Sequence, residues 1–163
     1  MSESLIRSDE EILEFIRCEK SIPKKPPSQK ETNRDLKRKF DVISTAKSLE
    51  FEVFFAQNIR LPSDFSIGLM LGKFLLIRYN GFHGTTNAGI HKYGHHAYVH
   101  SHTLTFDDIM NGRESNPSKL NDMTGSYFDY ESAQLYFLKE CNIVNFKEYF
   151  DFSKYNQMSF ADL

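Results

Sequence analysis

The sequence has no tryptophan and only two cysteines, Cys18 and Cys141. The cysteines lie far apart in the chain and neither belongs to a Cys-x-x-Cys pair, which excludes a cysteine-based zinc site and a dense disulfide framework. We expect both to be free thiols in a reducing compartment, although one disulfide between them stays open. This predicts a cytoplasmic protein.

Long apolar runs and targeting signals are also missing. No stretch approaches the roughly 18 apolar residues of a membrane-spanning helix. The N-terminal Met-Ser-Glu-Ser is not a basic segment followed by an apolar one, so we see no secretory signal. We therefore expect a soluble protein with no membrane partner.

Two common families of catalytic motif are absent as well. The glycines follow neither the Gly-x-x-x-x-Gly-Lys nor the Gly-x-Gly-x-x-Gly pattern, which disfavours nucleoside triphosphate binding. No serine or cysteine sits in a nucleophile elbow.

The composition that remains suits one aromatic-rich domain. The chain has 163 residues, 40% of them apolar, with 15 Phe and 8 Tyr. The net charge of −2 conceals an uneven distribution: residues 20–39 hold eight basic and two acidic side chains, and residues 106–163 hold five basic and ten acidic ones. A solvated basic linker is the favoured interpretation, and attraction of an anionic partner such as RNA is the alternative.

The N-terminal part divides into a helix and a linker. Ser8 to Glu11 has the form of a capping box, and the apolar residues that follow predict a helix within residues 1–19. Residues 20–38 are basic and contain Pro23, Pro26 and Pro27, which stop both helix and sheet. We expect an extended or mobile linker there, so the first helix packs loosely or against a protein partner.

Residues 39–163 predict an α+β domain. Apolar residues alternate with polar ones over 49–55 and 65–71, and Gly72-Lys73 suits a tight hairpin to a return strand over 74–79. A further strand is expected over 95–105, and Asp129 can cap a helix that runs to about Cys141. The predicted fold is a single, mainly antiparallel β-sheet of about five strands, with the N-terminal helix and C-terminal helices packed on it.

The six histidines all fall between His83 and His102. If residues 95–105 are extended, alternation places His96, Tyr98, His100 and His102 on one side of the strand, and Ala97, Val99, Ser101 and Thr103 on the other. Every site prediction depends on this extended conformation.

Three interpretations of the histidine cluster stay open. The favoured one is a solvent-facing sheet surface that carries His and Tyr without catalytic use. The second is a zinc site with His96, His100 and His102 as ligands, completed by His83, His91 or Asp107; zinc is the one cofactor considered. The third is acid–base chemistry on a phosphodiester by His100 and His102, assisted by His83, because an imidazole titrates near neutral pH.

The third interpretation also assigns substrate-binding residues. Arg78 could hold a phosphate by two parallel hydrogen bonds, although pairing with Glu50 or Glu52 is the favoured role. Tyr79, Tyr93 or Tyr98 could stack on a base. Asn80 belongs first to a turn with Gly81, and Asn87 would project from the following loop beside the histidine strand.

These segments resemble a family of small bacterial and phage proteins to which no activity is assigned. The similarity covers about residues 50–145: Phe65-Ser66, LLIRYNG ending at Gly81, His83, Thr86-Asn87, HHAYVHSHTLTFDD and ESAQLYFLKECNI. In that family an Arg-Tyr-Asn-Gly turn precedes a His-x-His strand and a C-terminal helix. The resemblance implies a matching fold and a bacterial or phage origin.

Three functions follow from the sequence, in this order. The first is an accessory or regulatory module that binds another macromolecule. The second is a small histidine-dependent RNase or phosphodiesterase, and the third is a zinc-dependent binding or hydrolytic domain. Whether the protein is an enzyme is left open, and the sequence indicates no oligomeric state.

Overall fold

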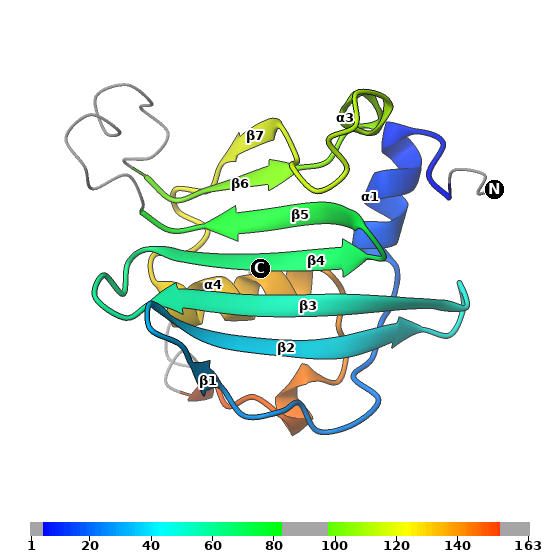
Figure 1. Cartoon of the computed structure of the whole chain (residues 1–163). Helices are drawn as coiled ribbons and strands as arrows, with labels where there is room; N and C mark the ends of the chain where they lie inside the picture. Colours follow the sequence, from blue (N-terminus) through cyan, green and yellow to red (C-terminus); the bar gives the residue numbers. More distant parts are fainter. Residues whose placement is uncertain (1–4, 83–97, 154–163) are drawn as a thin grey trace.

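The computed structural model describes residues 5–82 and 98–153 and contains one antiparallel sheet (Figure 1). In the described part of the chain seven strands pair in sequence order, each with the next. They are β1 (Lys30–Glu31), β2 (Asp35–Ser44), β3 (Leu49–Asn58), β4 (Phe65–Leu71), β5 (Phe74–Asn80), β6 (His100–Thr103) and β7 (Lys119–Asp122). The α+β class and the antiparallel sheet are confirmed, but the expected number of about five strands was too low.

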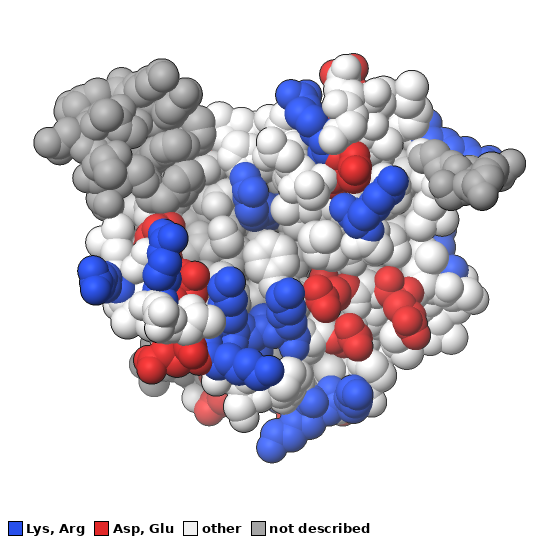
Figure 2. All heavy atoms as spheres, viewed as in Figure 1, with Lys and Arg blue, Asp and Glu red and all other residues white. Residues whose placement is uncertain are grey.

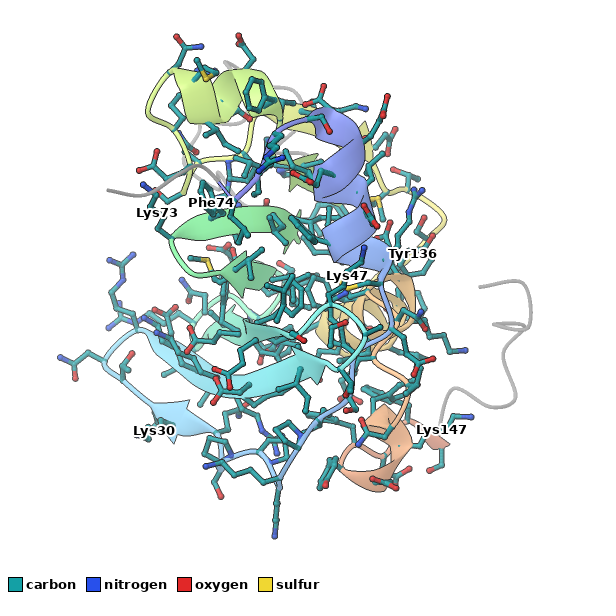
Figure 3. All side chains as sticks on the ribbon, turned by 90° about the vertical axis from the view of Figure 1, so that its right-hand side faces the viewer. Lys30, Lys47, Lys73, Phe74, Tyr136 and Lys147 are labelled. Atoms are coloured by element: carbon teal, nitrogen blue, oxygen red, sulfur yellow. The ribbon has the colours of Figure 1, made fainter. Side chains whose placement is uncertain are left out.

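The helices are α1 (Asp9–Arg17), α3 (Phe106–Met110), α4 (Tyr130–Glu140) and the 3₁₀ turn η2 (Phe146–Glu148). Both α1 and α4 lie on one side of the sheet, as the edge-on view in Figure 3 shows. They cover a continuous apolar core that includes Val53, Ile67 and Leu69, all with no solvent exposure. The opposite side of the sheet, called the outer face below, is turned to the viewer in Figures 1 and 2.

Period-two alternation builds the central strands. In β3 the buried residues Phe51, Val53 and Phe55 alternate with partly exposed ones. The predicted hairpin between β4 and β5 is present, and Gly72 adopts φ +58°, a left-handed conformation that glycine accepts at little cost.

The first helix belongs to the core. The Ser8 side chain accepts a hydrogen bond from the Glu11 amide at 3.1 Å, as the capping pattern predicted. Ile12, Phe15 and Ile16 are buried in the common core. The expectation of a loosely packed helix was therefore wrong, because its apolar stripe already has a partner in the sheet.

The segment predicted as a linker over 20–38 is also integrated. Lys20 forms a parallel bridge with Ile143 and Ser21 an antiparallel bridge with Ile43. Ile22 and Pro26 are buried, and β2 begins at Asp35 rather than at residue 39. The charged run Asp35–Lys39 becomes a strand because β3 supplies a full set of backbone partners, which local composition does not reveal.

Lys20 is the least expected member of the interior, with a relative exposure of 1%. Its ammonium donates hydrogen bonds to the carbonyl oxygens of Ile16 at 2.7 Å, Cys18 at 2.9 Å and Cys141 at 2.9 Å. These carbonyls belong to the C-terminal ends of α1 and α4, where the helix dipole favours a cation. Burial lowers the pKa of the Lys20 ammonium.

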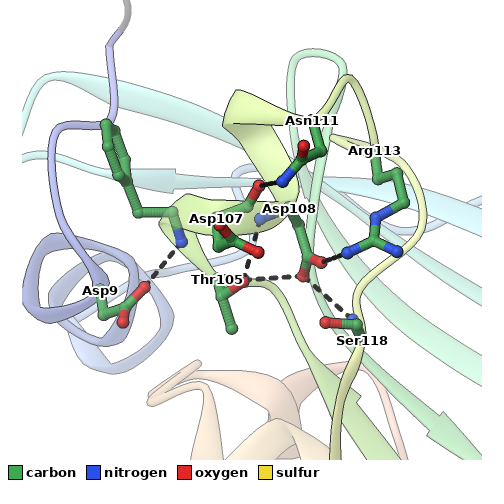
Figure 4. A network of polar contacts seen from close by, with 8 residues as sticks. Asp9, Thr105, Asp107, Asp108, Asn111, Arg113 and Ser118 are labelled. Atoms are coloured by element: carbon green, nitrogen blue, oxygen red, sulfur yellow. Dashed lines mark hydrogen bonds and ion pairs between the residues drawn. The ribbon is translucent and has the colours of Figure 1, made fainter.

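A second buried charge fixes the connection between β6 and β7 (Figure 4). Asp108 has a fully buried side chain that accepts from the amides of Thr105 and Ser118, both at 3.0 Å, and pairs with Arg113 at 2.9 Å. Burial alone would raise the pKa of Asp108, but the hydrogen bonds from Ser118 and Thr105 outweigh it and lower that pKa. Asp9 accepts from the Phe106 amide, which ties α3 to α1.

Both cysteines are unpaired, as predicted. Among the described residues, no helix combines the length and the apolar character that crossing a membrane requires.

Candidate functional site

The cross-strand register determines which side chains occupy the outer face. Two adjacent rows run across the strands from β2 to β6. One row contains Lys39, Phe54, Gly68, Arg78 and His102, and the other contains Lys37, Ala56, Ser66, Asn80 and His100. We call these ten residues the outer-face rows. Because neighbouring strands lie about 4.8 Å apart, the backbones of Lys39 and Arg78 are about 14 Å apart.

Arg78 stands near the middle of these rows and is half-buried. Its Nε donates to Asn80 Oδ1 at 3.3 Å, and Asn80 Nδ2 donates to Ser66 Oγ at 3.2 Å. Burial lowers the pKa of the Arg78 guanidinium. Arg78 is thus linked through hydrogen bonds to Asn80 and Ser66 within the outer-face rows.

The expected pairing of Arg78 with Glu50 or Glu52 was wrong. The register sets Glu52 opposite Met70, in a different row from Arg78. Within residues 5–82 and 98–153 the ion pairs are Lys47–Glu14 and Arg113–Asp108, so no carboxylate described in the structure neutralises Arg78.

Basic and acidic side chains both lie on the outer face (Figure 2). Alternation along β2 places Asp35, Lys37, Lys39 and Asp41 on this side, so the two exposed lysines lie between two acidic residues. On β3, Glu52 lies opposite Asp41, and Glu50 shares its side. Apart from Lys37 and Lys39, Arg78 is the only Lys, Arg, Asp or Glu in the outer-face rows. An open groove of about 490 Å³ adjoins Lys39, and its lining is of mixed charge: Lys24, Lys25, Pro26, Pro27, Lys39, Phe40, Asp41 and Glu52.

Phe54 lies between Lys39 and Gly68 in one of the outer-face rows, at a position where alternation predicts a polar residue. The side chain is half-buried, and its Cε1 and Cζ atoms occupy the space above Gly68: a Cβ added there would lie 2.3 and 2.4 Å from them. Sequence reasoning missed Phe54 as well as Lys37 and Lys39. The signal in the sequence was a phenylalanine on the polar side of its strand. Its neighbour on the next strand is a glycine, Gly68.

Only two of the six histidines, His100 and His102, lie in the described part of the chain. The strand β6 is shorter than the expected 95–105, and His83, Asn87, His91, Tyr93 and His96 lie outside the described residues. His100 and His102 share the outer side, with ring centroids 5.1 Å apart. His100 has no solvent exposure, and its Nδ1 lies 3.0 Å from the Tyr98 carbonyl oxygen.

This arrangement bears differently on the two chemical interpretations. A solvent-facing surface is the wrong description of His100, because this residue has no solvent exposure. The same burial gives a substrate no access to the His100 imidazole in the conformation described. Across the two described ranges, no three His, Cys, Asp or Glu side chains converge as metal ligands. Because His96 is not described, the zinc site stays a prediction.

Tyr79 faces the core rather than the outer face. Its ring stacks on Tyr127, with centroids 5.1 Å apart and planes at 9°, and its hydroxyl donates to the Glu140 carboxylate. The residue has no solvent exposure, and burial raises the pKa of its phenol. The prediction that Tyr79 stacks on a base was therefore wrong. Tyr98 is half-buried beside His100 and keeps that candidate role.

Comparison of the chain with models of protein families, with curated proteins and with solved structures gave no match. Function therefore has to be inferred from the site itself.

Proposed function

We propose that this protein is a macromolecule-binding module that holds an anionic partner on the outer face of its sheet. The observation that carries the proposal is the arrangement of Lys37, Lys39 and Arg78 in two adjacent rows that hold no carboxylate from β2 to β6. Asp122 on β7, the partner of His100, continues one of these rows and is its first acidic residue. The resemblance to bacterial and phage proteins suggests an accessory role in such a setting.

Electrostatics supports an extended ligand. Three cations on a surface that is otherwise polar and aromatic raise the local concentration of a polyanion and steer its approach. Asp41, Glu50 and Glu52 repel the same ligand on one side of the two lysines, and Asp35 does so on the other side. The ligand is thereby confined to the outer-face rows.

Binding of inorganic polyphosphate and of mixed-sequence RNA at low salt tests this proposal. The double variant Lys37→Glu/Lys39→Glu is expected to bind each at least about tenfold more weakly, because each substitution replaces an attraction with a repulsion. The matched control is Lys139→Glu on α4, an exposed lysine on the other side of the sheet, which should change affinity by less than about twofold. Equal losses in both variants, or no polyanion binding by the unaltered protein, would refute the proposal.

A nuclease at the same face is the second candidate, because Arg78 lies directly opposite His102 in the register. A guanidinium beside an imidazole can hold a phosphate next to a general acid or base. Cleavage of RNA by the unaltered protein, lost in His102→Ala, would support this activity. RNA that stays intact under binding conditions would rule it out.

A further inference from the structure

We infer that the anionic partner is a single-stranded nucleic acid and that Phe54 stacks on one of its bases. This inference deepens the proposed function and depends on it. It starts from an aromatic side chain on a strand position that otherwise carries polar groups: on the same side of β3, Glu50 and Glu52 precede Phe54.

Gly68 creates the seat for the ring. The missing side chain at Gly68 leaves room for the Cε1–Cζ edge of Phe54, and Leu75 closes the same space: its Cδ1 would lie 2.9 Å from an added Cβ. The ring is thus held against the sheet while part of it remains exposed. A ring held in this way loses little conformational freedom when a base stacks on it.

Within its row, Phe54 has a cation on each side. Lys39 is the direct partner of Phe54 on β2, and Arg78 lies two strands away on β5, beyond Gly68. A single strand offers unpaired base faces and a charged backbone together, which is the combination that an aromatic between cations recognises. A duplex hides its base faces in the stack, and an acidic peptide has no base to place on Phe54.

The direct test compares oligomers of about 12 nucleotides, a length within the usual range for one binding face. The oligomers are a mixed-sequence RNA, the same sequence in DNA, the corresponding duplex and an abasic strand of equal charge. We expect either single strand to bind more tightly than the duplex and about 5- to 100-fold more tightly than the abasic strand, since stacking supplies that factor. The two sugars are separate arms, and tight binding of either one supports the inference.

Substitutions of Phe54 test the same contact from the protein side. Phe54→Leu keeps an apolar group over Gly68 but removes the aromatic ring. Its affinity for the intact strand should fall by the same factor of about 5 to 100, and its affinity for the abasic strand should not change. Phe54→Tyr keeps the ring and should retain binding within about threefold. Unchanged thermal unfolding of both variants excludes a loss through misfolding.

The outcomes separate this inference from the proposed function. If the abasic strand binds as tightly as the intact strand, and Phe54→Leu has no effect while Lys37→Glu/Lys39→Glu does, base stacking is refuted and polyanion binding stands. Preference for the duplex also overturns the inference. If no oligomer and no polyphosphate binds, both proposals fall together.

Discussion

Replacing Lys20 with methionine removes the buried ammonium while keeping an apolar stem of similar length. The three carbonyl oxygens of Ile16, Cys18 and Cys141 then lose their common donor. Two helix ends also lose the cation that lies against their dipoles. The methionine side chain can keep the contact that the lysine makes with the ring of Phe51, where Nζ now lies 4.9 Å from the centroid.

The expected cost combines opposing effects. Hydrogen bonds from a charged donor contribute about 1.5–3 kcal/mol each, and buried acceptors left without a donor cost about 1–3 kcal/mol. Against this, methionine avoids the cost of several kcal/mol for burying an ammonium. We expect a net loss of about 3 kcal/mol in the free energy of unfolding, which corresponds to a Tm lower by about 6–12 °C for a chain of this size.

Thermal and urea unfolding of Lys20→Met measures this directly. The control is Lys147→Met, in which an exposed lysine on η2 is changed in the same way (Figure 3). It should stay within about 0.5 kcal/mol of the unaltered protein. If Lys20→Met proves as stable as the control, the ammonium is not what joins the two helix ends.

Three further predictions concern buried groups. The lowered pKa of Asp108 means that its carboxylate adds stability above the unfolded-state pKa of about 3.8 and that this stability is lost as pH falls through the folded-state value. Asp108→Asn should therefore cost about 2 kcal/mol at pH 7 and show a weaker loss of stability in acid, measured by denaturation at several pH values; an unchanged acid profile would contradict this. Burial raises the pKa of the Tyr79 phenol, so its protonated form adds stability below pH 10 that is lost as pH rises further. In an alkaline titration, phenolate absorbance should then rise at a higher pH than it does for free tyrosine, until the protein unfolds. Ionisation of every tyrosine at the pH of free tyrosine would refute this prediction. Gly81→Ala would place a Cβ 2.2 Å from the Ser63 carbonyl oxygen and should cost about 1–3 kcal/mol in urea denaturation, whereas a neutral effect would mean that the backbones do not approach so closely.

Local pattern was sufficient for the centre of the fold. The alternation in β3 and β4, the glycine of the hairpin and the capping of α1 and α4 are all properties of neighbouring residues, and each predicted element is present. Asp129 accepts from the Ser132 amide at 2.7 Å, as its place before an apolar run indicated.

The edges of the sheet could not be predicted in this way. The strand β7 reads Lys-Leu-Asn-Asp, which has little strand propensity, and it exists because β6 offers it a partner. The same holds for β1 and for the first residues of β2. Lys20 would be expected in solvent by composition alone, and only the meeting of two helix ends from distant parts of the chain makes its burial favourable.

For the site, the sequence placed His100 and His102 on one side of a strand but did not indicate their burial. It missed Phe54 as a site residue, because alternation shows the side of the strand that Phe54 occupies but only the register shows that it lies over Gly68. Arg78 was recognised, yet its lack of a glutamate partner depends on a register across β3, β4 and β5 that local pattern does not supply.

Nuclear magnetic resonance titration with a single-stranded oligomer tests the central claim most directly, because it reports where the ligand lies. Binding on the outer face should shift the ring signals of Phe54 and the Nε–H signal of Arg78, and should leave the side-chain signals of Ala133 and Leu138 in the core unchanged. Shifts confined to the helical side, or saturation with no change at Phe54, would contradict it.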